Sequence, residues 1–176
     1  MRIGLISDTH IPLNAEKLPL QLPSVFTGVE LILHAGDIYL TSVLDELGVL
    51  APVLAAYGDG DARIGTKMGV DLRLKKSHTI NVDGVYIGLV HEIRFPGVSL
   101  EKVFDCPVDI VVRGHSHEAS IETHQGVTVV NPGSATLPNH QLNKAGTVAL
   151  LDIVRRKVNA RIVQLDCEWG NKQGGG

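Results

Sequence analysis

The chain has 176 residues, of which 44% are hydrophobic and 20% are charged, and these values are ordinary for one globular domain. We therefore predict a single domain over residues 1–176, with 171–176 as a frayed tail. The formal net charge of −3 predicts no general nucleic-acid binding, and no apolar stretch is long enough for a signal peptide or a membrane span. These features favour a cytoplasmic protein, in which the distant Cys106 and Cys167 suggest neither a disulfide framework nor a thiolate zinc site.

The first part of the chain predicts strands separated by crossovers. A loop with at most a short helix is expected over Pro12–Phe26, because this stretch contains three prolines. Thr41 or Ser42 could cap a short helix that runs through Leu47. Short apolar runs predict three buried strands in this part of the chain. One ends at Leu5-Ile6, and the others are Glu30–His34 and Pro52–Tyr57. This alternation favours parallel strands with helices packed on the sheet.

After Gly69 the pattern favours antiparallel strands. Asp83-Gly84 between two strand-like runs is a hairpin signal, and Ser99–Phe104 could form a short helix. The predicted strands of this part are Asp71–Lys75, Thr79–Val82, Val85–Val90, Asp109–Val112, Ala119–Thr123, Val127–Val130, Thr147–Val154 and Val158–Leu165.

Five of the apolar runs end on side chains that bind metals. These are Asp8 with His10, Asp37, Asp59, His91, and His115 with His117. Open α/β sheets place their ligands at the carboxyl ends of strands, and residues two apart on an extended segment point the same way. Each position alone is more simply a turn, but five in series favour a metal centre. Carboxylates with imidazoles suit manganese, iron or zinc, and seven candidates suit two metals that share a carboxylate.

The motifs in this order resemble those of the calcineurin-like metallophosphoesterases, and among them the small single-domain prokaryotic phosphodiesterases related to the retromer subunit of the same fold. The matching motifs are Asp8-x-His10, Gly36-Asp37, Gly114-His115-x-His117 and Asn131-Pro132-Gly133-Ser134. His91 matches the first residue of the family's later His-Gly-His. The resemblance spans nearly the whole chain.

The resemblance implies an α/β fold, a four-layer α/β/β/α sandwich with two mixed sheets. It implies two divalent ions, one held by Asp8, His10 and His117 and the other by Asp59, His91 and His115, with Asp37 bridging both. Manganese is the family's commonest activator, with iron, zinc or nickel as alternatives. A hydroxide between the ions would attack the phosphorus of a small phosphate ester in line, and we expect phosphodiesters rather than monoesters as substrates.

Three departures from the family pattern bear on activity. Asp59 and Gly60 stand where Asn and then His or Cys are usual, and Glu92-Ile93 replaces a Gly and a second His. A third anionic ligand makes the centre about one charge less positive, which predicts tighter metal binding and weaker attraction for phosphate. Gly60 removes a side chain that could protonate the leaving group. Arg94 could hold a phosphate oxygen instead.

Other functions of the same residues are possible. A catalytically weak scaffold of the same fold, acting as a protein-interaction subunit, is the main alternative, and a homo-oligomer is possible. A haloacid-dehalogenase-like phosphatase would need an Asp at position 10, and a nucleotide-binding Rossmann domain would need a glycine-rich turn after the first strand.

The remaining histidines have simpler interpretations: a supporting hydrogen bond for His34, and turns or exposed strand positions for His78, His124 and His140.

Overall fold

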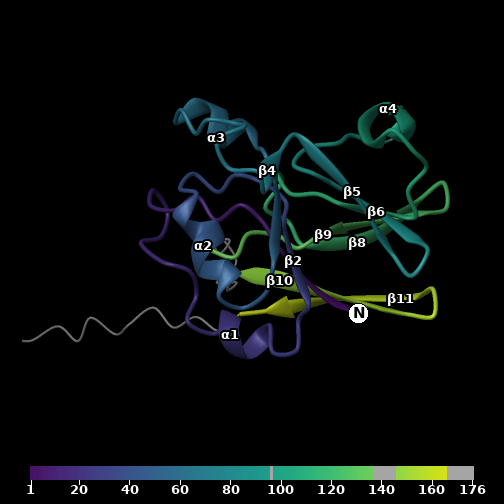
Figure 1. The fold of residues 1–176 in the computed structure, drawn as a ribbon, viewed down its shortest axis with the longest axis horizontal. Coiled ribbons are helices and arrows are strands. Elements are labelled where there is room, and N and C mark those ends of the chain that lie inside the picture. The colour runs from purple at the N-terminus through teal and green to yellow at the C-terminus, as the bar shows by residue number, and fades with distance from the viewer. Residues whose placement is uncertain (96, 137–145, 166–176) are drawn as a thin grey trace, which may run out of the picture.

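Two mixed β-sheets form the middle of the molecule (Figure 1). The computed structural model describes residues 1–95, 97–136 and 146–165. In the first sheet the strand order is β11 (Lys157–Gln164), β10 (Thr147–Val154), β1 (Arg2–Ile6), β2 (Leu31–His34), β3 (Val53–Ala56) and β4 (Leu74–Lys75). In the second sheet it is β5 (Ser77–Val82), β6 (Val85–Val90), β7 (Ile110–Val112), β9 (Val127–Asn131) and β8 (Ser120–His124).

Each sheet contains a run of parallel strands, with one antiparallel hairpin at one edge of the first sheet and a hairpin at each edge of the second. β1, β2, β3 and β4 run parallel in the first sheet, as do β6, β7 and β9 in the second. The hairpins are β5–β6, β8–β9 and β10–β11. The predicted turn at Asp83-Gly84 is confirmed, and both residues have the positive φ, 52° and 77°, that a two-residue hairpin turn requires.

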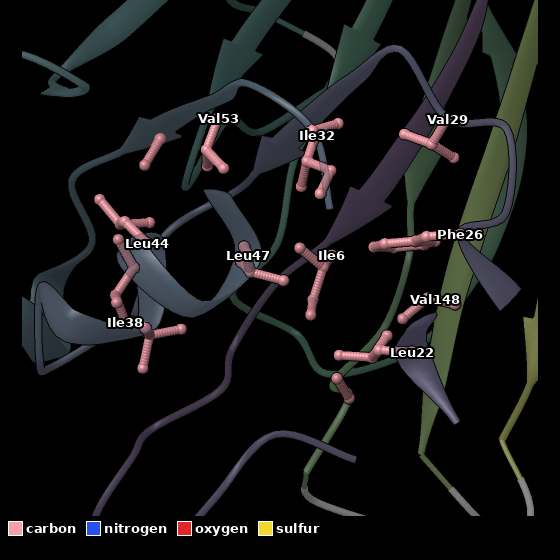
Figure 2. Close-up of a cluster of buried hydrophobic side chains, with 14 of the residues drawn as sticks. Ile6, Leu22, Phe26, Val29, Ile32, Ile38, Leu44, Leu47, Val53 and Val148 are labelled. Carbon is pink, nitrogen blue, oxygen red and sulfur yellow. The ribbon is translucent and has the colours of Figure 1, made fainter. Parts of the chain in front are cut away.

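The two sheets pack face to face through alternate apolar residues of their central strands. Leu5 and Leu33 of the first sheet belong to the same buried cluster as Leu89 and Val112 of the second. The outer face of the first sheet is covered by α1 (Leu22–Val25) and α2 (Ser42–Gly48), which enclose a second apolar cluster (Figure 2).

The fourth layer is α4 (Leu100–Phe104), which covers the outer face of the second sheet (Figure 1). Its Phe104 ring lies so close to β6 that a Cβ at Gly88 would come within 2.6 Å of it. The predicted four-layer α/β/β/α sandwich is therefore confirmed. The remaining helix, α3 (Asp59–Arg63), follows β3 directly.

Several local predictions need correction. Of the predicted strand at 71–75, only Leu74–Lys75 joins the sheet. Asp71 instead begins a turn, in which it accepts the backbone N–H groups of Arg73 and Leu74. His78 is buried rather than exposed, and its Nε2 bonds the carbonyl oxygen of Ala55 at 2.9 Å. His140, Cys167 and the predicted tail lie outside the described residues. Among the helices that are described, none combines the length and apolarity needed to cross a membrane.

Candidate metal centre

The parallel strands of both sheets direct their carboxyl ends to one edge of the sandwich. Asp8, Asp37 and Asp59 follow β1, β2 and β3, while His91 and His115 follow β6 and β7. The two sheets face each other, so these strand ends meet at one place. The predicted side chains therefore lie together, although Asp8 and His117 are 109 positions apart in the sequence.

Five of the seven predicted residues have a left-handed backbone rather than an extended one, Asp59 and His91 being the exceptions. Asp8 and His10 have φ of 52° and 45°, Asp37 has 56°, and His115 and His117 have 72° and 59°. The expectation that pairs two apart point alike on an extended chain is therefore wrong in its mechanism. Asp and His tolerate this region better than most residues, although each such position has an energetic cost that the surrounding hydrogen bonds must offset.

Asp8, His10 and His117 form the first candidate ligand group, since their side chains could hold one metal ion. The Nε2 atoms of His10 and His117 lie 3.2 Å apart, and Asp8 Oδ1 lies 3.8 Å and 3.4 Å from them. Among the described residues the buried Nδ1 of His10 has no hydrogen-bond partner. Two imidazole nitrogens facing each other beside a buried carboxylate oxygen fit one shared cation.

Asp59, His91 and His115 form the second candidate ligand group. Asp59 Oδ1 lies 3.2 Å from His91 Nε2 and 3.1 Å from His115 Nδ1. His91 Nδ1 lies 2.8 Å from the carbonyl oxygen of Ala35. If Nδ1 carries the proton and donates this bond, Nε2 is left with its lone pair toward Asp59, as metal binding requires.

Asp37 lies between the two groups. Its Oδ2 is 3.7 Å from His10 Nε2, and its Oδ1 is 3.5 Å from His91 Nε2. The side chain is almost completely buried, and Oδ1 also accepts the backbone N–H of Gly60 at 2.8 Å. A carboxylate with one oxygen toward each group can bridge two ions.

The electrostatics of the first group follow from burial and from the neighbouring charges. Burial acts to raise the pKa of Asp8, but hydrogen bonds with His117 and Ser7 outweigh it and hold that pKa below its usual range. The same carboxylate raises the pKa of His117. Burial lowers the pKa of His10 despite the nearby Asp37 and Asp8. Asp8 is therefore ready as an anionic ligand, whereas a proton competes with a metal for His117.

Asp61 was not predicted as part of the site, yet it fixes the segments around it. This fully buried carboxylate accepts backbone N–H bonds from Asp37 (3.1 Å), Ile38 (2.9 Å), Tyr39 (2.7 Å) and Gly58 (2.9 Å). Burial raises its pKa, while these bonds act in the opposite direction. The sequence signal was its place three residues after Gly58, the third residue of a helix, where an acidic side chain can reach back to the helix start.

Gly60 has no room for the side chain that the family usually carries there. A Cβ would lie 2.6 Å from Tyr39 Cε1 and 2.8 Å from Asp37 Oδ2. The Tyr39 ring also packs edge-on against His10, with ring centroids 4.7 Å apart. Tyr39 thus occupies the space beside Gly60, and a larger residue at position 60 would displace either the Tyr39 ring or the Asp37 carboxylate.

The end of β9 and the loop after it support the segments that carry the candidate ligands. Asn131 Nδ2 donates to Gly114 O and lies 3.0 Å from Ser116 Oγ. Ser134 Oγ donates to Asp8 O at 2.7 Å, and Thr136 Oγ1 to Thr9 O at 2.6 Å. The residues Asn131 and Ser134 therefore hold the backbone of the ligand segments. His34 has a similar supporting place, since its Nε2 lies 3.1 Å from Thr9 Oγ1.

Two arginines lie at the rim of the centre. Arg94 is 86% exposed, and its Nε donates to Glu92 Oε1 at 2.7 Å. Glu92 Oε1 in turn lies 3.8 Å from His115 Nε2. Arg63, which was not predicted, donates from Nη2 to Asp59 Oδ2 at 2.5 Å. Its position four residues after Asp59 was the available sequence signal.

The fold and these two groups of ligands define a metallophosphoesterase. Residues 1–156 match the family model of the calcineurin-like phosphoesterase superfamily domain, and the chain belongs to this superfamily. A probable metallophosphoesterase of Methanothermobacter thermautotrophicus is 33% identical over 168 residues, which cover 93% of this chain and 92% of that protein. A phosphodiesterase of Methanocaldococcus jannaschii is 25% identical over 173 residues, covering 93% of this chain and all of the relative (100%).

Solved structures share the fold. Vacuolar Protein Sorting 29 from Cryptosporidium parvum superposes with a TM-score of 0.69 at 22% identity, covering 93% of this chain and 96% of that chain. An archaeal phosphodiesterase gives a TM-score of 0.66 at 24% identity, covering 93% of this chain and 100% of the other. The Entamoeba histolytica form of the sorting protein, solved with Zn²⁺, gives 0.67 at 26% identity, covering 94% and 100%.

Proposed function

We propose that this protein is a dinuclear metal-dependent phosphoesterase that hydrolyses small phosphate diesters in the cytoplasm. The observation that carries the proposal is the position of Asp37, whose two oxygens face two separate groups of ligands. The phosphodiesterase relative supports diesters over monoesters. The mixture of carboxylate and imidazole ligands supports manganese, with iron, zinc or nickel as alternatives.

Two divalent ions bound in these groups would neutralise the charge of a phosphate ester and activate water for in-line attack. The protein's own residues hold this arrangement. Asp61 fixes the backbone of Asp37 and of the two residues that follow it. Asn131 and Ser134 fix the segments of His115 and Asp8. Arg94 is a proposed contact for a phosphate oxygen, supported by its link through Glu92 to the side of His115.

Asp37→Ala tests the proposal. We expect wild-type protein to bind about two manganese ions per chain and to hydrolyse bis-nitrophenyl phosphate only with manganese. The variant should bind at most about one ion, and turnover should fall by at least about a hundredfold, because both ions lose the shared ligand. Metal content is measured by elemental analysis and hydrolysis by release of nitrophenolate.

Asp45→Ala is the matched control, since it removes an exposed carboxylate of α2 that bonds Arg73 and belongs to neither ligand group. It should keep both metals and turnover. Metal binding without hydrolysis of any phosphate ester by wild-type protein would contradict an enzyme and favour the alternative, a scaffold that acts through a protein partner. The exposed apolar side chains Val49, Val70 and Leu72 are the observation that keeps this alternative open.

A further inference from the structure

Asp59 uses its two carboxylate oxygens for two different partners. Oδ1 lies 3.2 Å from His91 Nε2 and 3.1 Å from His115 Nδ1, within the second ligand group. Oδ2 accepts a hydrogen bond from Arg63 Nη2 at 2.5 Å. One oxygen therefore faces the metal position, and a guanidinium holds the other.

Helix α3 sets this geometry. Asp59 and Arg63 are its first and last residues, four positions apart and hence on the same face. The start of the helix is fixed by Asp61, which accepts the backbone N–H of Gly58 and of Asp37. The pair itself is exposed, with 78% of the Arg63 side chain and 39% of the Asp59 side chain accessible, so it contributes little to folding stability.

The pair matters for the charge of the centre. The ligand groups contain three carboxylates, on Asp8, Asp37 and Asp59, so two divalent ions leave a formal charge of about +1 before any hydroxide. Arg63 adds one positive charge beside the third carboxylate. The total formal charge, about +2, then equals that of two divalent ions held by two carboxylates and a neutral amide. The electrostatic attraction for a phosphate anion is therefore preserved.

We propose, on the basis of the function proposed above, that Arg63 is a charge-compensating residue that offsets the negative charge of Asp59 and so sustains binding of a phosphate anion. It holds Asp59 Oδ2 and leaves Oδ1 for the metal. The sequence alone predicted that Asp59 weakens phosphate binding, because it showed an additional negative charge. The structure adds the positive charge of Arg63 beside that carboxylate.

A double-mutant cycle tests the proposal with Arg63→Gln, Asp59→Asn and the double variant. Calorimetry measures the binding of manganese to each metal-free protein and of inorganic phosphate to each manganese-loaded protein. Arg63→Gln should weaken phosphate binding about two- to fivefold, the range of an exposed ion pair, while manganese binds at least as tightly as before. In the Asp59→Asn background, Arg63→Gln should have little effect on phosphate.

Arg2→Gln is the matched control, because Arg2 also donates to a carboxylate, Asp152, at 2.8 Å, but lies on β1 at the opposite end from the ligands. It should change neither affinity. The proposal is overturned if Arg63→Gln leaves phosphate binding unchanged, weakens manganese binding, or weakens phosphate binding equally in the Asp59→Asn background, which would indicate direct contact with phosphate.

The two proposals fail in different ways. Coupling between Asp59 and Arg63 in a protein that binds manganese but hydrolyses no phosphate ester would support the role of Arg63 and contradict the phosphoesterase. Hydrolysis of a phosphate ester without coupling between Asp59 and Arg63 would support the phosphoesterase and contradict the role of Arg63. A wild-type protein that binds no manganese would contradict both.

Discussion

The buried carboxylate of Asp61 accepts four backbone hydrogen bonds. Its oxygens join the segment of Asp37 to the start of α3, and the N–H groups that they accept come from Asp37, Ile38, Tyr39 and Gly58. Hydrogen bonds to an ionised acceptor are about twice as strong as neutral ones, and a buried N–H without a partner is costly. The position of the Asp37 carboxylate therefore depends on a residue that lies outside both candidate groups of ligands.

Asp61→Asn should destabilise the protein by about 2–4 kcal/mol, because the amide NH₂ faces backbone donors and leaves at least one of them unpaired. Urea denaturation of the metal-free protein measures the effect. Asp59→Asn, on the same helix but 39% exposed in its side chain, is the control and should change the free energy of unfolding by less than about 0.5 kcal/mol. Equal effects of the two substitutions would show that the backbone bonds to Asp61 are not the cause.

At the scale of elements, the loop after β9 connects segments that belong to different sheets. β9 lies in the second sheet, yet Ser134 and Thr136 bond the backbone of residues 8 and 9, which follow β1 of the first sheet. Asn131 bonds Gly114 and Ser116 on its own sheet. These hydrogen bonds thus hold the candidate ligand segments of both sheets in place, and they support the left-handed backbone at Asp8 and next to His115.

Asn131→Ala should weaken manganese binding about 10- to 100-fold while the fold is retained, since supporting hydrogen bonds orient ligands without contacting the ion. Calorimetric titration measures the affinity, and far-ultraviolet circular dichroism checks the fold. Asn81→Ala provides the comparison, because Asn81 accepts one backbone bond in the exposed β5–β6 hairpin. The loop would have no such role if both variants bound manganese like the wild type.

The stability of the whole molecule should depend on pH through its buried histidines. Burial lowers the pKa of His34 from 6.5 to about 3, and burial also lowers the pKa of His78. As pH falls below 6.5, His34 takes up a proton in the unfolded chain, whereas in the folded protein it stays neutral until the pH approaches 3. Folding stability from this residue is therefore fully present at neutral pH and is lost progressively between about pH 6.5 and 3.

We expect the free energy of unfolding of the metal-free protein to decrease by up to about 1.4 kcal/mol per pH unit for His34 between pH 6 and 4. His34→Gln, which cannot titrate, should show a shallower dependence even if it is less stable at pH 7. Urea denaturation at pH 7, 6, 5 and 4.5 gives both slopes. Parallel slopes for the two proteins would exclude His34 as the source.

The four layers were implied by the family resemblance. The sequence by itself predicted most of the strands along the chain, the hairpin turn and the candidate ligands. Local signals were sufficient here, because apolar runs of four to six residues form strands, Asp83-Gly84 forms a hairpin turn, and Asp or His after a strand end is visible along the chain. The motif order, from Asp8 to His117, carried the resemblance to a family whose model matches residues 1–156.

Only the tertiary structure decided how these side chains are held. The left-handed backbone at Asp8 and His115, the four bonds to Asp61 and the Tyr39 ring beside Gly60 all depend on contacts between segments far apart in sequence. His78 was misjudged for the same reason, because its burial comes from the end of β3 and not from its own strand. Periodicity reports which face of an element is apolar, whereas packing between two sheets determines which polar groups become buried and what they bond.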